Sequence, residues 1–248
     1  MRLSTVAAPT PLQRFFWHLR SLGPRSVLDV GCGRGDLLAL CNDEGIEAHG
    51  VDRGRHNIEE ARARGLHASE GYAEKLALPD RCFDWTVLRN VLHHIPNTEA
   101  TLREALRVAR CGVLIAEPWA DLTVSSQRLA HDIDDWSKAV HQALGYYHRP
   151  GLTLTEVQAA LPEHPAVRAT VDYFANLERV SADPIFDRMA EFVSRLPETH
   201  PLKDQGENLE RRAKENEVSS MGSMTVTVLI SAPVQEQHRG SAQSVTIP

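Results

Sequence analysis

Three glycines at alternate positions, Gly31, Gly33 and Gly35, follow an apolar run in the stretch VLDVGCGRGD. Because glycine has no Cβ, a turn from a strand into a helix can adopt positive φ there and approach a ligand closely. The helix N-terminus just beyond such a turn presents free N–H groups. Asp52 follows about 20 residues further on, at the spacing where a carboxylate accepts both hydroxyls of a ribose. Together these residues predict a nucleoside site rather than a plain tight turn.

The glycine spacing and a nearby acid favour a cofactor with a cationic end. A dinucleotide site prefers G-x-G-x-x-G, whereas the spacing here is G-x-G-x-G and Asp36 comes next. Asp29 lies inside the apolar run, before the first glycine, where a carboxylate suits an ammonium group or a bound water better than a pyrophosphate. A nicotinamide-dependent oxidoreductase is the rival interpretation, and such an enzyme would bind a dinucleotide.

Strands and helices that alternate along the first half would place these residues at one edge of a sheet. Apolar, strand-like runs occur at Ser26–Val30, Glu47–Asp52, Leu66–Gly71, Phe83–Arg89 and Gly112–Glu117. Helical patterns separate them, as at Ile58–Arg64 and Leu102–Ala109. This rhythm predicts an α/β fold with a doubly wound, mostly parallel sheet that binds ligands at the carboxyl ends of its strands.

The second half is less regular. Two further runs, Val167–Phe174 and Met224–Ile230, predict an antiparallel pair of strands at the sheet edge. Between them, Pro184–Leu196 carries one apolar face, and we expect this helix to close the site as a lid, together with an N-terminal helix that begins near Pro11. The charged stretch Glu207–Glu217 predicts a solvated helix.

Four stretches resemble the class I S-adenosylmethionine (SAM)-dependent methyltransferases, in particular the group with a Leu-His-His-Ile signature after the fourth strand. They are VLDVGCGRGD, GVD, YAEKLALPDRCFDWTVLRNVLHHIP and REALRVARCGVLIAEPW. The likeness runs from Ser26 to Trp119. It implies a seven-stranded, Rossmann-like sheet with an antiparallel edge strand and helical lid insertions. It also implies SAM as cofactor and S-adenosylhomocysteine as product.

The resemblance also implies which residues hold the cofactor. Those expected at the methionine end are Asp29, Gly31, Cys32 and Gly33; the ribose would take Asp52, and the adenine edge Ala73, Glu74 and the backbone carbonyl of Arg89. Two positions depart from the family pattern. Tyr72 stands where the family often has an acid, and Arg53 stands where an apolar residue often covers adenine. Tyr72 could stack or hydrogen-bond, and the Arg53 guanidinium could lie flat on the ring.

The chemistry implied for such a site is an in-line displacement, which mainly requires alignment of two reactants. Alignment alone supplies roughly 7 to 11 kcal/mol of the barrier, so a base is needed only for a hydroxyl or a protonated amine. His93 and His94, just after the fourth strand, are the candidate bases. We favour His94, because related phosphoethanolamine methyltransferases use a histidine at the corresponding spacing. In the alternative interpretation, the pair only packs and hydrogen-bonds the cofactor loop.

Aromatic residues outside the sheet predict the acceptor. The candidates are Phe16, Trp17, Glu117, Trp119, Tyr146 and Tyr147. Rigid rings suit a planar acceptor, and a carboxylate could accept a hydrogen bond from a ring N–H. We therefore expect methylation of a nitrogen or oxygen on a small aromatic or heterocyclic metabolite, as in secondary metabolism. A quinone methyltransferase, a protein methyltransferase and a catalytically inactive SAM-binding partner protein remain as alternatives.

Composition limits the partners. The net charge of -6, with no basic block, argues against a nucleic-acid partner. No apolar run approaches the roughly 20 residues that a membrane helix requires. The four cysteines form no C-x-x-C pair and no His/Cys cluster at zinc spacing, so we expect reduced thiols, a cytoplasmic protein and no metal site. We expect a monomer or homodimer that acts on a small molecule.

A single methyltransferase domain is expected over residues 1–234. Within it, residues 1–24 would form a cap helix, residues 25–119 the SAM-binding core, and residues 120–165 and 176–220 the substrate and lid helices. Residues 235–248 would form a flexible tail, because they are polar and without an apolar pattern.

Overall fold

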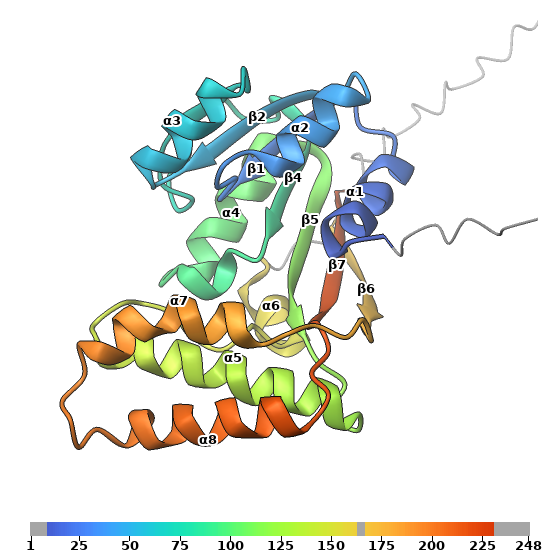
Figure 1. The fold of residues 1–248 in the computed structure, drawn as a ribbon. Coiled ribbons are helices and arrows are strands. Elements are labelled where there is room, and N and C mark those ends of the chain that lie inside the picture. Colours follow the sequence, from blue (N-terminus) through green and yellow to red (C-terminus); the bar gives the residue numbers. More distant parts are fainter. Residues whose placement is uncertain (1–8, 163–166, 231–248) are drawn as a thin grey trace, which may run out of the picture.

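A seven-stranded sheet forms the centre of the computed structural model, which describes residues 9–162 and 167–230. The expected tail, and the ends of two expected segments at 1–8 and 163–165, lie outside these residues. The strand order is β3-β2-β1-β4-β5-β7-β6 (Figure 1). The strands are β1 (Ser26–Val30), β2 (Glu47–Asp52), β3 (Ala68–Glu70), β4 (Phe83–Arg89), β5 (Ala109–Trp119), β6 (Val167–Phe174) and β7 (Gly222–Ile230).

The pairing of the strands confirms the expected fold class. The strands β1 to β5 pair in parallel, whereas β7 runs antiparallel to both β5 and β6. Strands β1, β2, β4 and β6 have the bounds that their apolar runs predict. Strand β5 begins earlier, at Ala109, because it follows α4 without a connecting loop. The order reverses at β1, and the carboxyl ends of β1 and β4 meet there.

Two helical layers cover the faces of the sheet. The helices are α1 (Pro11–Ser21), α2 (Asp36–Asp43), α3 (Arg55–Ala63), α4 (Thr98–Val108), α5 (Ser125–Ala143), α6 (Leu154–Ala160), α7 (Asp183–Ser194) and α8 (Pro201–Glu215), with a 3₁₀ turn at Leu92–His94. One core cluster joins α1, α2 and α3 to the sheet, and a second joins α4 and α6 to its other face. Burial on both faces explains why the parallel strands read as continuous apolar runs.

A third group of helices, α5, α7 and α8, lies beyond the carboxyl ends of β4 and β5 (Figure 1). Its core contains Ile133 and Trp136 of α5 with Met189 of α7. The prediction of a solvated α8 was wrong for one face of this helix, where Leu209 is buried and Gly206 packs against the Trp136 ring. The charges of α8 occupy its outer face, and the sparse apolar residues at helical spacing still form an inner face.

Helix α1 does not close the carboxyl edge of the sheet, as the N-terminal stripe had suggested. Phe15, Phe16 and Leu19 are buried in the core that α1 shares with α2. His18 Nε2 lies 2.9 Å from Thr227 Oγ1 in the middle of β7, so α1 packs along the face of the sheet (Figure 1). The apolar stripe of α1 is covered there, because it packs against the apolar residues of α2 and the sheet.

Among the described residues, none of the helices combines the length and apolar character needed to cross a bilayer.

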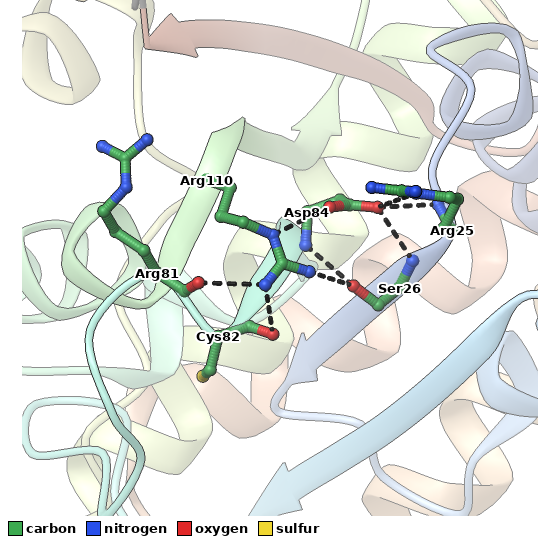
Figure 2. A network of polar contacts seen from close by, with 6 residues as sticks. All are labelled: Arg25, Ser26, Arg81, Cys82, Asp84 and Arg110. Carbon is green, nitrogen blue, oxygen red and sulfur yellow. Dashed lines mark hydrogen bonds and ion pairs between the residues drawn. The ribbon is translucent and has the colours of Figure 1, made fainter.

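A polar network fixes the amino ends of β1, β4 and β5 (Figure 2). Asp84 Oδ2 accepts hydrogen bonds from the backbone N–H groups of Arg25 at 2.9 Å and Ser26 at 3.2 Å. Its Oδ1 accepts from Arg110 Nε at 2.9 Å, and Arg110 also donates to the carbonyl oxygens of Arg81 and Cys82. Three strands are therefore held in register at this edge, which aligns their carboxyl ends at the opposite edge.

We expect Asp84→Ala to lower the free energy of unfolding by about 2–4 kcal/mol, because it leaves buried N–H donors without an acceptor. Asp80→Ala is the matched control, since Asp80 also pairs with an arginine, Arg107, but is exposed. An exposed pair of this kind contributes less than about 1 kcal/mol. Urea unfolding of both variants measures the difference, and equal losses would contradict the structural role of the network.

Candidate active site

A pocket of about 430 Å³ opens at the carboxyl ends of β1, β2 and β4. We call it the first pocket. Its lining residues come from the ends of these strands and from the loops that follow: Val30, Gly31, Val51, Asp52, Arg53, Asn57, Gly71, Tyr72, Ala73, Glu74, Asn90, Val91, His94, Ile95 and Pro96. The sheet reverses its strand order here, which is where open α/β folds bind their ligands.

The glycine turn after β1 has the geometry that the sequence predicts. Gly31 has φ +75°, and a Cβ at this position would lie 2.2 Å from Val91 Cγ2. Gly33 has φ +53°, and no described heavy atom outside its immediate chain neighbours lies within 4 Å of where its Cβ would be. Gly31 is therefore required by close packing, whereas Gly33 borders open space.

Asp52 connects this turn to the second strand. Its Oδ2 accepts from the backbone N–H of Gly33 at 2.9 Å, and its Oδ1 accepts from the N–H of Gly54 at 2.7 Å. Asn57 Nδ2, at the start of α3, donates to the same Oδ1 at 3.2 Å. A carboxylate offers about four acceptor positions, so Asp52 retains capacity for a ribose hydroxyl.

The residues expected at the adenine end also line the first pocket. Arg53, Tyr72, Ala73 and Glu74 all contribute to its wall. Sequence reasoning missed further wall residues, chiefly Asn57, Asn90, Val91, Ile95 and Pro96. The segment from Asn90 could have been inferred, because it continues directly from a strand that ends at the site.

Four expected cofactor residues, Asp29, Cys32, Gly33 and Arg89, are not among those that line the first pocket. Asp29 is 4% exposed, and burial raises the pKa of its carboxyl group to about 7; the Arg89 charge opposes this shift and the Asp52 charge adds to it. The Cys32 side chain points into the core, where a Cβ at Gly50 would lie 2.5 Å from its Sγ. Burial also raises the pKa of this thiol. Contacts of Asp29, Cys32 and Arg89 with a cofactor remain predictions.

Glu117 holds His93 and does not face an acceptor. The Glu117 side chain is fully buried; its Oε2 lies 2.7 Å from His93 Nδ1, and its Oε1 accepts from the Leu92 N–H at 3.1 Å. Because a carboxylate can only accept, His93 carries its hydrogen on Nδ1 and leaves Nε2 without one when neutral. The expectation that Glu117 accepts a hydrogen bond from an acceptor ring was wrong, because its side chain is fully buried and lines neither the first nor the second pocket.

His93 and His94 belong to a larger group of rings that includes His148, which we call the histidine cluster. The ring centroids of His94 and His148 are 4.2 Å apart, and those of His93 and His94 are 4.3 Å apart. Burial lowers the pKa of His94 to about 4 and that of His148 to about 3, and charges on neighbouring histidines act in the same direction. Both rings are neutral near pH 7. His94 can therefore accept a proton there, although as a weaker base than an exposed histidine.

A second pocket, of about 450 Å³, lies at the carboxyl end of β5, the strand next to β4 in the sheet. Its wall includes Trp119 and Tyr173, whose ring centroids are 5.1 Å apart, and the carboxylates of Asp134 and Asp135 on α5. Lys138, also in this wall, acts electrostatically on His94 and His148. Of the cluster, His94 lines the first pocket, and His148 is two residues before Pro150, which lines the second.

The other expected acceptor residues are placed elsewhere. Phe16 is buried in the α1 core, and Trp17 is 53% exposed on the same helix. Tyr146 and Tyr147 are also exposed; the Tyr146 hydroxyl accepts from Arg195 Nη1 at 3.1 Å. In the described part of the chain, none of these four residues lines the first or second pocket. Of the Tyr146–His148 segment, the structure brings His148 to the site.

A sheet of this order, with a nucleoside-type pocket where its strand order reverses, defines the class of Rossmann-like SAM-dependent methyltransferases, enzymes whose cofactor is SAM. A family model described as a methyltransferase domain matches residues 24–188, and the chain belongs to that family. These residues include the glycine turn, the histidine cluster and part of α7.

Curated relatives are similar over part of their length. Ajmaline N-methyltransferase of Rauvolfia serpentina is 29% identical over 120 residues, which are 43% of this chain and 40% of the relative. Demethylmenaquinone methyltransferase of Listeria welshimeri is 33% identical over 101 residues, 37% of this chain and 43% of the relative. The similarity thus spans about two fifths of these proteins.

Solved structures share the fold. The YcgJ protein of Bacillus subtilis superposes with a TM-score of 0.60 at 18% identity, covering 89% of this chain and 99% of that one. Phosphoethanolamine N-methyltransferase 2 of Haemonchus contortus, solved with phosphomonomethylethanolamine and S-adenosylhomocysteine, gives 0.56 at 16% identity, covering 93% of this chain and 55% of that one. These superpositions establish the architecture of the sheet and its helical layers. At such low sequence identity they show the fold alone.

The raised pKa of Asp29 predicts how cofactor binding depends on pH. Below about pH 7 this carboxyl is protonated and cannot attract an ammonium group; above it, the negative charge is present. The affinity for S-adenosylhomocysteine should therefore rise about tenfold from pH 6 to pH 8, with a proton released on binding. Calorimetry in buffers of different ionisation enthalpy measures both quantities.

Asp29→Asn should abolish this pH dependence. Asp36→Asn, in the exposed position that ends the same glycine turn, should retain it, because the Asp36 carboxylate pairs with Arg64 on the protein surface. A pH profile that is the same in Asp29→Asn and in the unmodified chain would assign the titration to another group.

Proposed function

We propose that this chain transfers a methyl group from SAM to a nitrogen or oxygen of a small, planar aromatic or heterocyclic acceptor. The observation that carries the proposal is a pair of pockets of different character at the carboxyl ends of neighbouring strands. The first pocket has Gly31 of the glycine turn and Asp52 of a nucleoside site, and the second has aromatic rings and carboxylates. The donor would bind in the first pocket and the acceptor in the second, and His94, which lines the first, is the candidate base.

The first pocket has the features that SAM requires. Gly31 brings bare backbone to its wall, Asp52 has acceptor capacity for a ribose hydroxyl, and the wall near Tyr72 and Ala73 suits an adenine ring. When bound, SAM supplies an electrophilic methyl group on a sulfonium. The chain itself would orient both reactants and exclude water, and His94 would take a proton from an acceptor that carries one.

The second pocket supports the choice of acceptor. The Trp119 and Tyr173 rings lie at an interplanar angle of 51°, so they can contact a planar ring from two directions. Asp135 lies in the same wall, and burial raises the pKa of its carboxyl group. A carboxylate beside aromatic rings favours an acceptor with an N–H or a cationic nitrogen. The name of the N-methyltransferase relative from Rauvolfia agrees with nitrogen as the methylated atom.

A quinone ring methylated on carbon is the second candidate, favoured by the names of the demethylmenaquinone methyltransferase and C-methyltransferase relatives. The half-buried carboxylates of Asp134 and Asp135 argue against an oxidised quinone, because its ring has no donor for these oxygens.

We place the reaction in the cytoplasm, since Cys32, Cys41, Cys82 and Cys111 are free thiols in the described chain.

Turnover with SAM and a panel of heterocyclic amines, phenols and hydroquinones tests the proposal. Mass spectrometry with methyl-labelled SAM identifies the product, and NMR locates the methyl group. We expect N- or O-methylated products. Carbon methylation would favour the quinone candidate, and tight cofactor binding without turnover of any acceptor would favour an inactive partner protein.

Trp119→Ala should raise the acceptor KM by about tenfold and leave cofactor affinity unchanged, because it removes one ring from the second pocket. Trp17→Ala is the matched control: it removes an exposed ring from α1, and both constants should stay at the wild-type values. Equal effects of the two substitutions would show that the acceptor does not occupy the second pocket.

A further inference from the structure

Three histidines that are distant in sequence offer nitrogen ligands at one point in the structure. His93 and His94 follow β4, whereas His148 lies in the loop after α5. Each ring offers one nitrogen, and the three nitrogens lie within 4.8 Å of one another. Zinc binds histidine nitrogen at about 2.0–2.1 Å, so each ring would have to move inward by about 1 Å to close around an ion.

We propose that His93, His94 and His148 form a binding site for a divalent transition metal of the zinc type. Imidazole ligands suit Zn²⁺, Ni²⁺ and Cu²⁺, and three protein ligands with an open fourth position are typical of catalytic zinc. The sequence did not reveal the site, because His148 is 54 positions from His94 and the usual motifs bring zinc ligands much closer together.

The hydrogen bonds around the cluster orient its rings for a metal. A metal-bound histidine generally donates its other N–H to a carboxylate or another acceptor. His93 Nδ1 donates to the buried Glu117 at 2.7 Å, which leaves Nε2 for the ion. His148 Nδ1 lies 2.7 Å from His141 Nδ1, and with the hydrogen on His148 its Nε2 is also left for the ion. Two of the three ligands thus have a fixed orientation before any metal binds.

The charges at the site allow a cation. The buried Lys138 and the exposed Arg53 both act electrostatically on His94, and Lys138 is paired with Asp134 on the same helix. The Glu117 carboxylate, fully buried, adds a negative charge one side chain away from the ion.

The position of the site also suggests its use, and this step rests on the proposed function. His94 lines the first pocket, so an ion held by the cluster would lie at the edge of that pocket. Its open position could hold an oxygen or nitrogen atom of the acceptor beside the donor. With metal bound, His94 serves as a ligand and no longer as the base.

Metal binding by the untagged full chain tests the proposal directly. After removal of metals with a chelator, titration with Co²⁺ should give one tetrahedral site per chain by visible absorption, and competition with Zn²⁺ should displace the cobalt. His148→Ala should weaken binding at least 100-fold. His141→Ala, which removes a neighbour of a ligand, should weaken it about 10- to 100-fold.

His56→Ala is the matched control, because His56 is exposed on α3 and pairs with Glu60; it should bind cobalt as the wild type does. Absence of a tetrahedral cobalt spectrum in the wild type, or equal affinity in His148→Ala, would overturn the site. Calorimetry with S-adenosylhomocysteine on the metal-free chain separates this failure from a failure of the proposed function, since cofactor binding should be the same with and without metal.

Discussion

The Asp52 carboxylate is the contact on which the site depends. It accepts hydrogen bonds from Gly33 in the turn after β1, from Gly54 after β2 and from Asn57 at the start of α3. Backbone hydrogen bonds also tie the glycine turn to β2, because the Gly31 and Cys32 N–H groups donate to the Val51 carbonyl at 2.7 and 3.2 Å. The Asp52 side chain extends this connection to Gly33, to the loop after β2 and to α3, so it holds together three segments that border the first pocket.

A second buried carboxylate performs the same task at β5. Glu117 binds the Leu92 N–H and the His93 ring, so it holds the 3₁₀ turn that presents the two histidines. The next residues of β5, Pro118 and Trp119, already belong to the second pocket. Two strands, β2 and β5, thus each contribute one acid that orders a loop at the carboxyl edge. The network of Asp84 at the opposite edge holds β1, β4 and β5 in register, because it connects the residues at which these strands begin.

The sequence predicted the sheet well, because parallel strands that are buried on both faces are continuous apolar runs in the sequence. Four strands have the predicted bounds, and Asp52 lies where the ribose carboxylate was expected. The acceptor side was predicted poorly. Aromatic residues occur both in protein cores and in binding pockets, so the sequence alone does not distinguish the two. The packing of α1 shows that Phe16 belongs to the core. Likewise Glu117 reads as a free acid in the sequence, while its burial against His93 depends on a contact between two separate strand ends.

The place of His148 in the site could not be predicted from the sequence either. No local pattern connects it to His94, and α5 has to fold back over the carboxyl edge before the two rings meet. The helices α5, α7 and α8 form their own core, so the position of His148 follows from the packing of a helical group that has no counterpart in the strand pattern. Residues at such a junction are set by tertiary contacts, and they become visible only when the layers are assembled.

Calorimetric titration with S-adenosylhomocysteine and with NAD tests the central claim, that Asp52 organises an adenosyl amino-acid site. The account predicts saturable binding of S-adenosylhomocysteine and no binding of NAD. It also predicts at least about fivefold weaker binding in Asp52→Ala, from the loss of 1 kcal/mol or more. Glu47→Ala, an exposed acid at the other end of β2, should bind as the wild type does. Unchanged affinity in Asp52→Ala, or tight binding of NAD, would contradict the account.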